Sequence, residues 1–180
     1  MTAIVGLVHE GTVFIGGDSA GVSGYSLTVR ADQKVFTTGP YVMGFTTSFR
    51  MGQLLRYAFA PPAPDGEQLE KFMATTFIDA VRETLKAGGW LRKDSEQEEG
   101  GTFLVGVAGR LFIVRDDFQV GEAADGYAAV GCGEEIAVGA LYATAKLDMD
   151  PAVRVVCALS AAERFSAGVR RPFTLVSASG

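Results

Sequence analysis

The sequence predicts an α+β fold in which two antiparallel sheets pack face to face and helices cover each outer face, a four-layer αββα sandwich. Two observations carry this prediction. Short β-branched segments occur in pairs around tight glycine turns, which is typical of hairpins and excludes a purely parallel sheet. Amphipathic helical segments also occur in two pairs, one for each outer layer. A length of 180 residues suits one domain over residues 1–180.

Two hairpins are expected at the start of the chain. Glu10-Gly11 and Gly39-Pro40 are dipeptides that favour tight turns, and each lies between two apolar, β-branched segments. The four strands of these hairpins are residues 3–10, 11–17, 34–38 and 41–46.

Apolar residues then change to helical spacing. Met51, Leu54 and Leu55 share one face of a helix that Ser48 is placed to cap, and the prolines of residues 61–64 end this helix. A longer helix follows, before a polar loop over residues 88–101. Its expected inward residues are Leu69, Phe72, Met73, Thr76, Phe77, Ala80 and Leu85.

The second half of the chain repeats the order of strands and then helices. Gly109 joins two strands, and Gly131-Cys132-Gly133 turns the chain into a third long helix. Asp150 is an expected N-cap and Pro151 a first-turn proline for the fourth helix. The expected strands are residues 102–108, 110–115, 118–120, 127–130 and 173–176.

Composition excludes several classes of function. The net charge of −5 and the dispersed lysines and arginines argue against a nucleic-acid partner. No apolar segment approaches the ~20 residues that a membrane helix needs, and the N-terminus does not have the pattern of a secretory signal. Cys132 and Cys157 lie in apolar or glycine-rich surroundings, so we expect reduced, buried thiols in a cytoplasmic protein.

Three polar residues are expected to meet at one edge of the first sheet. Removal of Met1 would leave Thr2 with a hydroxyl and a free α-amine, and this amine can act as the base that a threonine nucleophile needs. Asp18 follows the antiparallel partner strand and Lys34 begins the next one, so both can reach Thr2. A cation there lowers the pKa of the amine and stabilises negative charge on the attacking oxygen.

Gly44, in a strand of the second hairpin, is a candidate oxyanion donor through its backbone N–H, because glycine allows a substrate to approach closely. An ordinary strand glycine is the alternative. Asp18 and Lys34, taken singly, are equally compatible with a turn acid and a surface lysine. Their joint spacing behind Thr2 favours catalysis.

Other chemistries are less well supported. Gly17-Asp18-Ser19-Ala20-Gly21 matches the G-x-S-x-G pattern of serine hydrolases, but no histidine follows Ser19 to serve as its base. His9 is the single histidine, and no cysteine–histidine cluster exists that could bind a metal. We therefore expect no metal and no cofactor.

The stretches Thr2…Gly16-Gly17-Asp18, Lys34-Val35 and Gly44-Phe45 resemble the proteasome β-subunit and HslV peptidase family of N-terminal nucleophile hydrolases. The resemblance covers nearly the whole chain, including Ala129–Gly133 and Glu163–Gly168, and the short bacterial HslV-like branch is the most similar. It implies the N-terminal nucleophile hydrolase fold. Thr2 would be the nucleophile, Asp18 and Lys34 its supporting pair, and Gly44 the oxyanion donor.

The resemblance implies further site residues. Cys132 stands where the family has a serine near the terminal amine, and a thiol is a weaker hydrogen-bond partner. Glu163 and Ser166 match an aspartate and a serine of the proteasome branch. The residues expected to face the substrate pocket are Gly21, Asp32 and Phe45.

The expected function is that of a threonine-type endopeptidase that encloses its active sites in a ring of identical subunits, fed with protein or peptide substrates by an AAA+ unfoldase ATPase. Phe49, Tyr57 and Phe59 are candidates for apolar ring contacts, with the protein core as the alternative. Two other functions stay open: a non-catalytic assembly subunit on the same scaffold, and an amidase acting on a small molecule.

Overall fold

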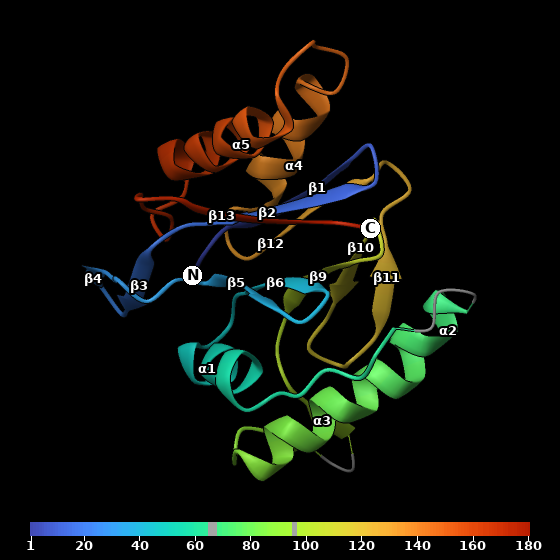
Figure 1. Ribbon diagram of the computed structural model, residues 1–180. Helices are drawn as coiled ribbons and strands as arrows, with labels where there is room; N and C mark the ends of the chain where they lie inside the picture. The colour runs from blue at the N-terminus through green and yellow to red at the C-terminus, as the bar shows by residue number, and fades with distance from the viewer. Residues whose placement is uncertain (65–67, 95–96) are drawn as a thin grey trace.

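The computed structural model describes residues 1–64, 68–94 and 97–180. Two antiparallel sheets lie face to face, and helices cover the outer face of each (Figure 1). The predicted four-layer αββα sandwich is confirmed.

The first sheet contains the first and the last strand of the chain, and its strand order is β12-β1-β2-β13. Helices α4 (Glu134–Ala143) and α5 (Pro151–Phe165) cover its outer face (Figure 1). The strands are β1 (Ile4–His9), β2 (Thr12–Gly17), β12 (Tyr127–Val130) and β13 (Thr174–Ser179).

The second sheet has the order β11-β10-β9-β6-β5. Its outer face is covered by α1 (Phe49–Tyr57) and by a longer helical stretch, which comprises α2 (Leu69–Phe72), the π-helical segment η1 (Met73–Phe77) and α3 (Ile78–Ala87). The strands are β5 (Val35–Thr38), β6 (Tyr41–Phe45), β9 (Phe103–Val107), β10 (Arg110–Val114) and β11 (Val120–Glu122).

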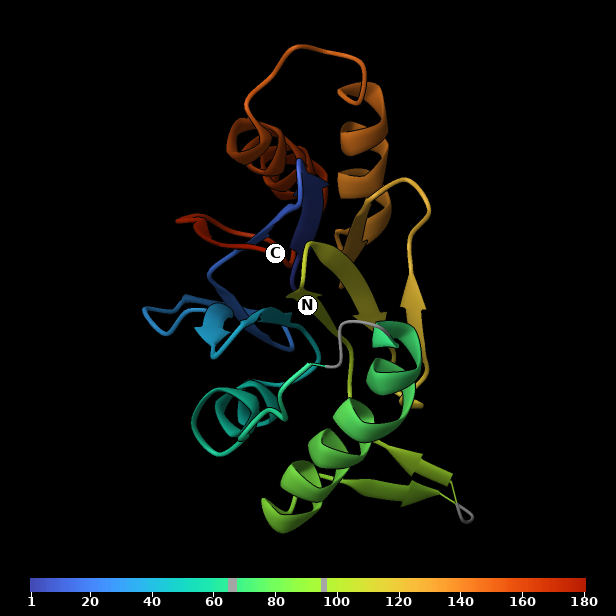
Figure 2. The same ribbon diagram turned by 45° about the vertical axis from the view of Figure 1, so that its right-hand side comes forward.

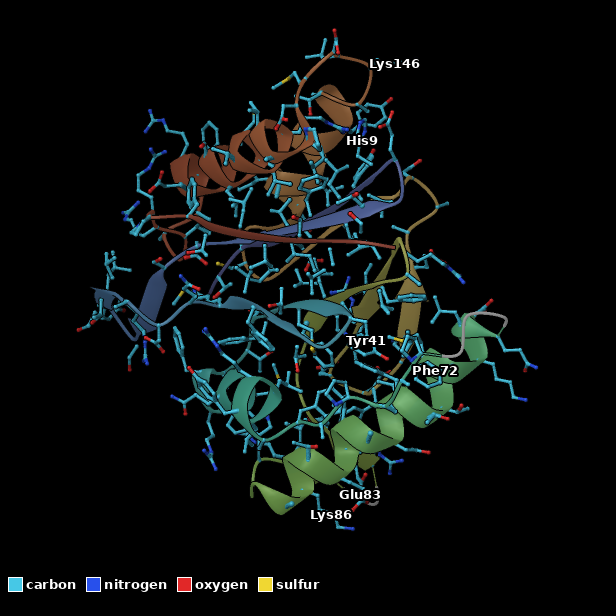
Figure 3. The ribbon with its side chains drawn as sticks, in the orientation of Figure 1. His9, Tyr41, Phe72, Glu83, Lys86 and Lys146 are labelled. Carbon is cyan, nitrogen blue, oxygen red and sulfur yellow. The ribbon has the colours of Figure 1, made fainter. Side chains whose placement is uncertain are left out.

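Alternation along the strands divides the core into three apolar layers. In β1, Val5 and Leu7 face α4 and α5, whereas Ile4 faces the other sheet and packs among the residues between the two sheets. Tyr41 and Phe72 belong to the third layer, between the second sheet and its helices, and Glu83 and Lys86 lie on the outer face of α3 (Figure 3).

Two hairpin turns form where local sequence signals predicted them. Glu10 and Gly11 both have positive φ, 47° and 73°, and Ala108 and Gly109 repeat this with 48° and 71°. Positive φ at both central residues is the pattern of a type I′ turn, the turn that suits a two-residue hairpin.

The helix caps also agree with the sequence. Ser48 accepts a hydrogen bond from the Arg50 N–H at the start of α1, and Asp150 accepts from Ala152 and Val153 at the start of α5. Each cap satisfies N–H groups that would otherwise have no partner at the first turn of the helix.

The long second helix differs from the prediction in its inward face. Thr76 was expected inside but is exposed, and Ala80 is only partly buried. Phe77 and Leu85 are buried as predicted, but Ile78 and Val81 take the inward places expected for Thr76 and Ala80, because the π-helical segment Met73–Phe77 has a wider turn than an α-helix. The uniform 3.6-residue spacing assumed from the sequence therefore fails here.

Two hairpins were not predicted. β3 (Ala20–Ser23) and β4 (Ser26–Val29) project from the sandwich beside the N-terminus (Figure 1). β7 (Arg92–Asp94) and β8 (Gln97–Glu99) lie within the predicted polar loop, of which residues 95–96 fall outside the described residues. This second hairpin lies beside α3, to which the ion pair between Arg82 and Glu98 joins it (Figure 2).

Two burial predictions were wrong or only partly right. Cys132 and Cys157 are free and exposed, because the first lies in a surface turn and the second on an outward position of α5. Among the proposed ring-contact aromatics, Phe59 is buried edge-on against Phe77 and Phe49 is half-buried, whereas Tyr57 is exposed.

Within the described ranges, the structure contains no helix that is both long and apolar enough to cross a membrane.

Candidate active site

The side chains of Thr2, Asp18 and Lys34 meet at one edge of the sandwich, which we call the site rim. Lys34 Nζ lies 2.8 Å from Thr2 Oγ1 and 2.7 Å from Asp18 Oδ1. All three residues are buried, with exposed fractions of 4%, 2% and 2% in chain order. The structure therefore brings together the three groups that the sequence proposed.

Strand pairing explains how groups so distant in sequence become neighbours. Ile4 of β1 pairs with Gly17 of β2, so Thr2 and Asp18 lie just beyond the same end of this antiparallel pair. Lys34 directly precedes β5 in the other sheet and reaches across from there. The site is thus built where the two sheets face each other.

The Asp18 carboxylate is held by four donors. Oδ1 accepts from the Ala3 N–H at 3.1 Å and from Lys34, while Oδ2 accepts from Ala20 at 2.8 Å and Arg170 at 3.1 Å. A buried carboxylate is tolerated when it is paired and its lone pairs are hydrogen-bonded, as here. Asp18 consequently anchors three separate segments of backbone around Lys34.

Burial changes the acidity of Lys34. Desolvation lowers the pKa of this ammonium below its ordinary value, and the charge and hydrogen bond of Asp18 oppose the shift without cancelling it. A more acidic ammonium is a stronger hydrogen-bond donor to a negatively charged oxygen. Lys34 is thus suited to stabilise charge on Thr2 Oγ1.

The turn Gly131-Cys132-Gly133 holds the backbone of Thr2. The Thr2 N–H donates to Cys132 Sγ at 3.3 Å, and the Gly133 N–H donates to Thr2 O at 3.3 Å. Gly131 has φ 103°, and a Cβ there would lie 2.3 Å from Thr2 O. Only glycine fits this position, because both the backbone conformation and the close approach exclude a side chain.

Ser166 lies beside this turn, with its Oγ 3.2 Å from Cys132 Sγ. Glu163 lines one hollow with Ser166, and its carboxylate accepts from both the N–H and the Nε of Arg171, each at 2.8 Å. Burial raises the pKa of Glu163, but these bonds from Arg171 outweigh it and lower the pKa overall. The structure therefore joins Cys132 and Ser166 to Thr2 and pairs Glu163 with an arginine.

Met1 covers the hydroxyl of Thr2, the residue expected to be the nucleophile. Its carbonyl oxygen accepts a hydrogen bond from Thr2 Oγ1, while its side chain is exposed and lies against Gly168. With Met1 attached, the nitrogen of Thr2 is an amide and cannot accept a proton. The nitrogen that faces Cys132 is the one that would become the α-amine.

A small pocket of about 70 Å³ opens beside Thr2. Phe45, a predicted pocket residue, lies on its wall. Gly44 does not line it: a Cβ at Gly44 would lie 2.5 Å from Ile4 Cγ2, so this glycine meets the demand of core packing between the sheets. The lining residues are Met1, Thr2, Val22, Lys34, Phe45, Thr46, Thr47, Ser48 and Phe49.

Thr47 lines this pocket, and sequence reasoning missed it. Its φ of 63° is in the left-handed region, unusual for a threonine. Thr46 and Ser48 donate their N–H groups to Thr102 O and Thr46 O, whereas no hydrogen bond from the Thr47 N–H is found within the described part of the chain. The sequence does not predict this conformation, because threonine seldom adopts positive φ.

The other two predicted pocket residues belong to a neighbouring hollow or its edge. Gly21 lines a second hollow of about 360 Å³ over the β3–β4 hairpin. Asp32 lines neither hollow and instead pairs with Arg30, where hydrogen bonding lowers the pKa of its carboxyl. Arg30 and Val22 were missed, since the hairpin that carries Val22 was not predicted.

Among the described residues, no group of three or more histidine, cysteine, aspartate or glutamate side chains is arranged to bind a metal.

Comparisons with known proteins bear on the fold. Neither the protein-family models nor the curated protein sequences give a match to this chain. Solved structures do match over nearly the whole chain. BPH of Thiobacillus denitrificans in complex with epoxomicin has a TM-score of 0.81 at 19% identity, covering 98% of both chains.

Two further neighbours agree. HslV of Trypanosoma brucei has a TM-score of 0.70 at 19% identity and covers 99% of both chains. The Gly-1 mutant of Anbu from Hyphomicrobium sp. strain MC1 has a TM-score of 0.70 at 17% identity, covering 99% of this chain and 82% of the other. The chain therefore has the HslV-like and proteasome-like N-terminal nucleophile hydrolase fold that the sequence resemblance implied.

Proposed function

We propose that this protein is a threonine-type endopeptidase in which removal of Met1 exposes Thr2 as an N-terminal nucleophile. The observation that carries this proposal is the buried chain of contacts from Thr2 Oγ1 through Lys34 Nζ to Asp18, 2.8 Å and 2.7 Å long. A buried lysine that donates to a threonine hydroxyl beside a small pocket has little value for folding, since apolar residues would fill that space at least as well.

The first chemical step is attack of Thr2 Oγ1 on a peptide carbonyl carbon. The hydroxyl proton passes to the α-amine, and the Lys34 ammonium stabilises negative charge on Oγ1. The carbonyl oxygen becomes an oxyanion, and we propose the N–H of Thr47 as its donor, because Thr47 lines the pocket and its N–H has no hydrogen-bond acceptor among the described residues. The sequence favoured Gly44 for this role, but Gly44 packs between the sheets.

Collapse of the tetrahedral intermediate breaks the C–N bond. The protonated α-amine gives its proton to the leaving nitrogen, and an ester joins the acyl group to Thr2 Oγ1. Water then attacks the ester, delivers a proton to the same amine, and releases the carboxylic acid with Thr2 restored. Cys132, which contacts the Thr2 nitrogen, and Ser166 behind it orient the amine in both steps.

Assembly follows as part of the same proposal: a single domain over residues 1–180, in a cytoplasmic ring of identical subunits served by an AAA+ unfoldase. Large apolar side chains are exposed on or near α4 and α5, and they are the candidates for a subunit contact. They are Val138, Tyr142, Leu147, Val153, Val156 and Phe165.

Turnover assays test the proposal. Protein prepared to begin at Thr2 should cleave unfolded protein and peptide amides, whereas protein that keeps Met1 should not. Thr2→Ala should lower kcat/KM by about 10³-fold or more. The matched control is Thr12→Ala, at the opposite end of β2, which should change activity little.

Other results would favour the two alternatives. Turnover of small amides without cleavage of peptides would indicate an amidase, and assembly without any turnover would indicate a structural subunit. Peptide cleavage that persists in Thr2→Ala would contradict the proposed mechanism.

A further inference from the structure

Two hollows at the site rim share two lining residues, one of which carries an aromatic ring. The smaller, of about 70 Å³, contains Thr2 and Lys34, and the larger, of about 360 Å³, lies over the β3–β4 hairpin. Phe49, the first residue of α1, lines both hollows together with Val22. The position of the Phe49 ring therefore determines how much space a substrate finds next to Thr2.

Arg30 holds that ring from the side of the larger hollow. Its guanidinium carbon lies 3.7 Å from the centre of the Phe49 ring, a cation–π distance. Its Nε and Nη2 donate to the two carboxylate oxygens of Asp32, both at 2.7 Å, which fixes the plane of the guanidinium. Arg30 also needs Gly21, since a Cβ there would lie 2.8 Å from Arg30 Cδ.

Phe45 holds the ring from the protein side. The two rings are 5.8 Å apart and nearly perpendicular, the edge-to-face arrangement that aromatic pairs favour. Phe49 is thus fixed between a buried aromatic ring and a paired arginine. While both contacts are in place, the Phe49 ring is held from moving into one hollow to enlarge the other.

We propose that Phe49, clamped by Arg30, is the specificity-determining residue of the site and restricts the substrate side chain next to the scissile bond to small, uncharged groups such as alanine or serine. This inference rests on the proposed function. An apolar cavity of about 150 Å³ binds benzene, and the smaller hollow has less than half of that volume while Met1, which lines it, is attached. The nearest charges, on Lys34 and Arg30, are already paired with aspartates.

Removal of Met1 enlarges the smaller hollow, because Met1 is one of its lining residues. It does not remove the walls formed by Phe45 and Phe49. An aromatic substrate side chain would still meet the Phe49 ring.

The test is the ratio of kcat/KM for two peptide coumarin amides that differ only in having alanine or phenylalanine before the scissile bond. A ratio within one variant does not depend on the fraction of protein that is folded. The wild type should favour alanine by about tenfold or more. Phe49→Ala should shift the ratio toward phenylalanine by about tenfold, and Arg30→Ala in the same direction by less.

Arg110→Ala is the matched control. Arg110 also forms a two-point ion pair with a carboxylate, that of Glu122, and is similarly exposed, but it lines neither hollow. Its ratio should equal that of the wild type. A wild type that cleaves both substrates equally well, or ratios unchanged in both Phe49→Ala and Arg30→Ala, would overturn this inference and leave the peptidase intact. A wild type that cleaves neither substrate while Thr2 stays unreactive would overturn both.

Discussion

The two ends of the sandwich differ in how they satisfy their polar groups. At the end away from the site, which we call the far rim, the β1–β2 turn, the β9–β10 turn and the C-terminus meet through backbone contacts, such as the hydrogen bond from Gly180 N–H to Gly11 O at 2.9 Å. His9 lies at this end (Figure 3). At the site rim, side chains satisfy the polar groups, and Lys34 and Asp18 are buried together as an ion pair.

The difference has an energetic consequence. Backbone turns at the far rim need glycine conformations but no buried charge, so each contact there contributes modestly. A buried ion pair contributes little net stability, yet loss of one partner leaves the other charge unpaired and is very costly. Under the proposed function, the buried charges of the site rim serve chemistry and not stability, so substitutions at the two rims should separate stability from activity.

Asp18→Asn should have the largest effect. It removes the negative charge and leaves the Lys34 ammonium buried without its partner, which we expect to lower the free energy of unfolding by about 3–5 kcal/mol and to abolish turnover. Chemical denaturation measures the loss. Asp79→Asn, which breaks an exposed ion pair with Arg82, should cost at most about 1 kcal/mol. Equal losses in the two variants would contradict the contrast.

Gly109→Ala tests the far rim. Gly109 has φ 71°, and a Cβ there would lie 2.9 Å from Gly11 O, so we expect a loss of about 1–2 kcal/mol. Activity per folded molecule should not change. In the control Gly139→Ala, on an open face of α4, stability should rise by about 0.5–1 kcal/mol. A fall in kcat for Gly109→Ala would show that the rims are coupled.

Cys132→Ala tests the support of the nucleophile nitrogen. Loss of the sulfur acceptor at 3.3 Å should lower kcat/KM roughly three- to tenfold, and Cys132→Ser should recover most of it. Cys157→Ala serves as control, since this second exposed thiol lies on α5. Unchanged kinetics in Cys132→Ala would show that Cys132 does not contribute to catalysis.

Tyr41→Phe should give the smallest effect, and one that depends on pH. Burial raises the pKa of Tyr41 from 10.0 to about 12, and its hydroxyl donates to Pro62 O. The folded state therefore holds this proton more tightly than the unfolded state, and the stability it contributes is lost as pH rises between these values. The variant should be about 1 kcal/mol less stable at neutral pH. Its deficit should shrink as denaturation is repeated toward pH 12; a constant deficit would argue against the shift.

Local features of the fold could be predicted from the sequence, whereas features that depend on distant residues could not. The turns at Glu10-Gly11 and Gly109 and the caps Ser48 and Asp150 are local, and each could be assigned from a few neighbouring residues. Thr2 and Asp18 could be placed together because hairpin pairing converts a distance along the chain into adjacency. What depends on non-local packing was missed.

Three features show why the rest could not be predicted. The π-helical segment at Met73–Phe77 leaves no clear signal in the apolar spacing, so Thr76 was placed inside. Arg30 follows the β3–β4 hairpin and Phe49 begins α1, and no sequence pattern in either segment predicts their contact. Thr47 has positive φ without being glycine or asparagine, which only the surrounding structure can impose.

The central claim is that Thr2 becomes a free N-terminal nucleophile held by Lys34 and Asp18. Intact mass of the protein before and after incubation with a peptide epoxyketone that carries alanine next to the reactive ketone tests it most directly. The account predicts a mass without Met1 and then a gain of one inhibitor per chain, localised to Thr2 by fragmentation and lost in Thr2→Ala. A chain that starts at Thr2 yet gains no mass, or an adduct on any other residue, would contradict it.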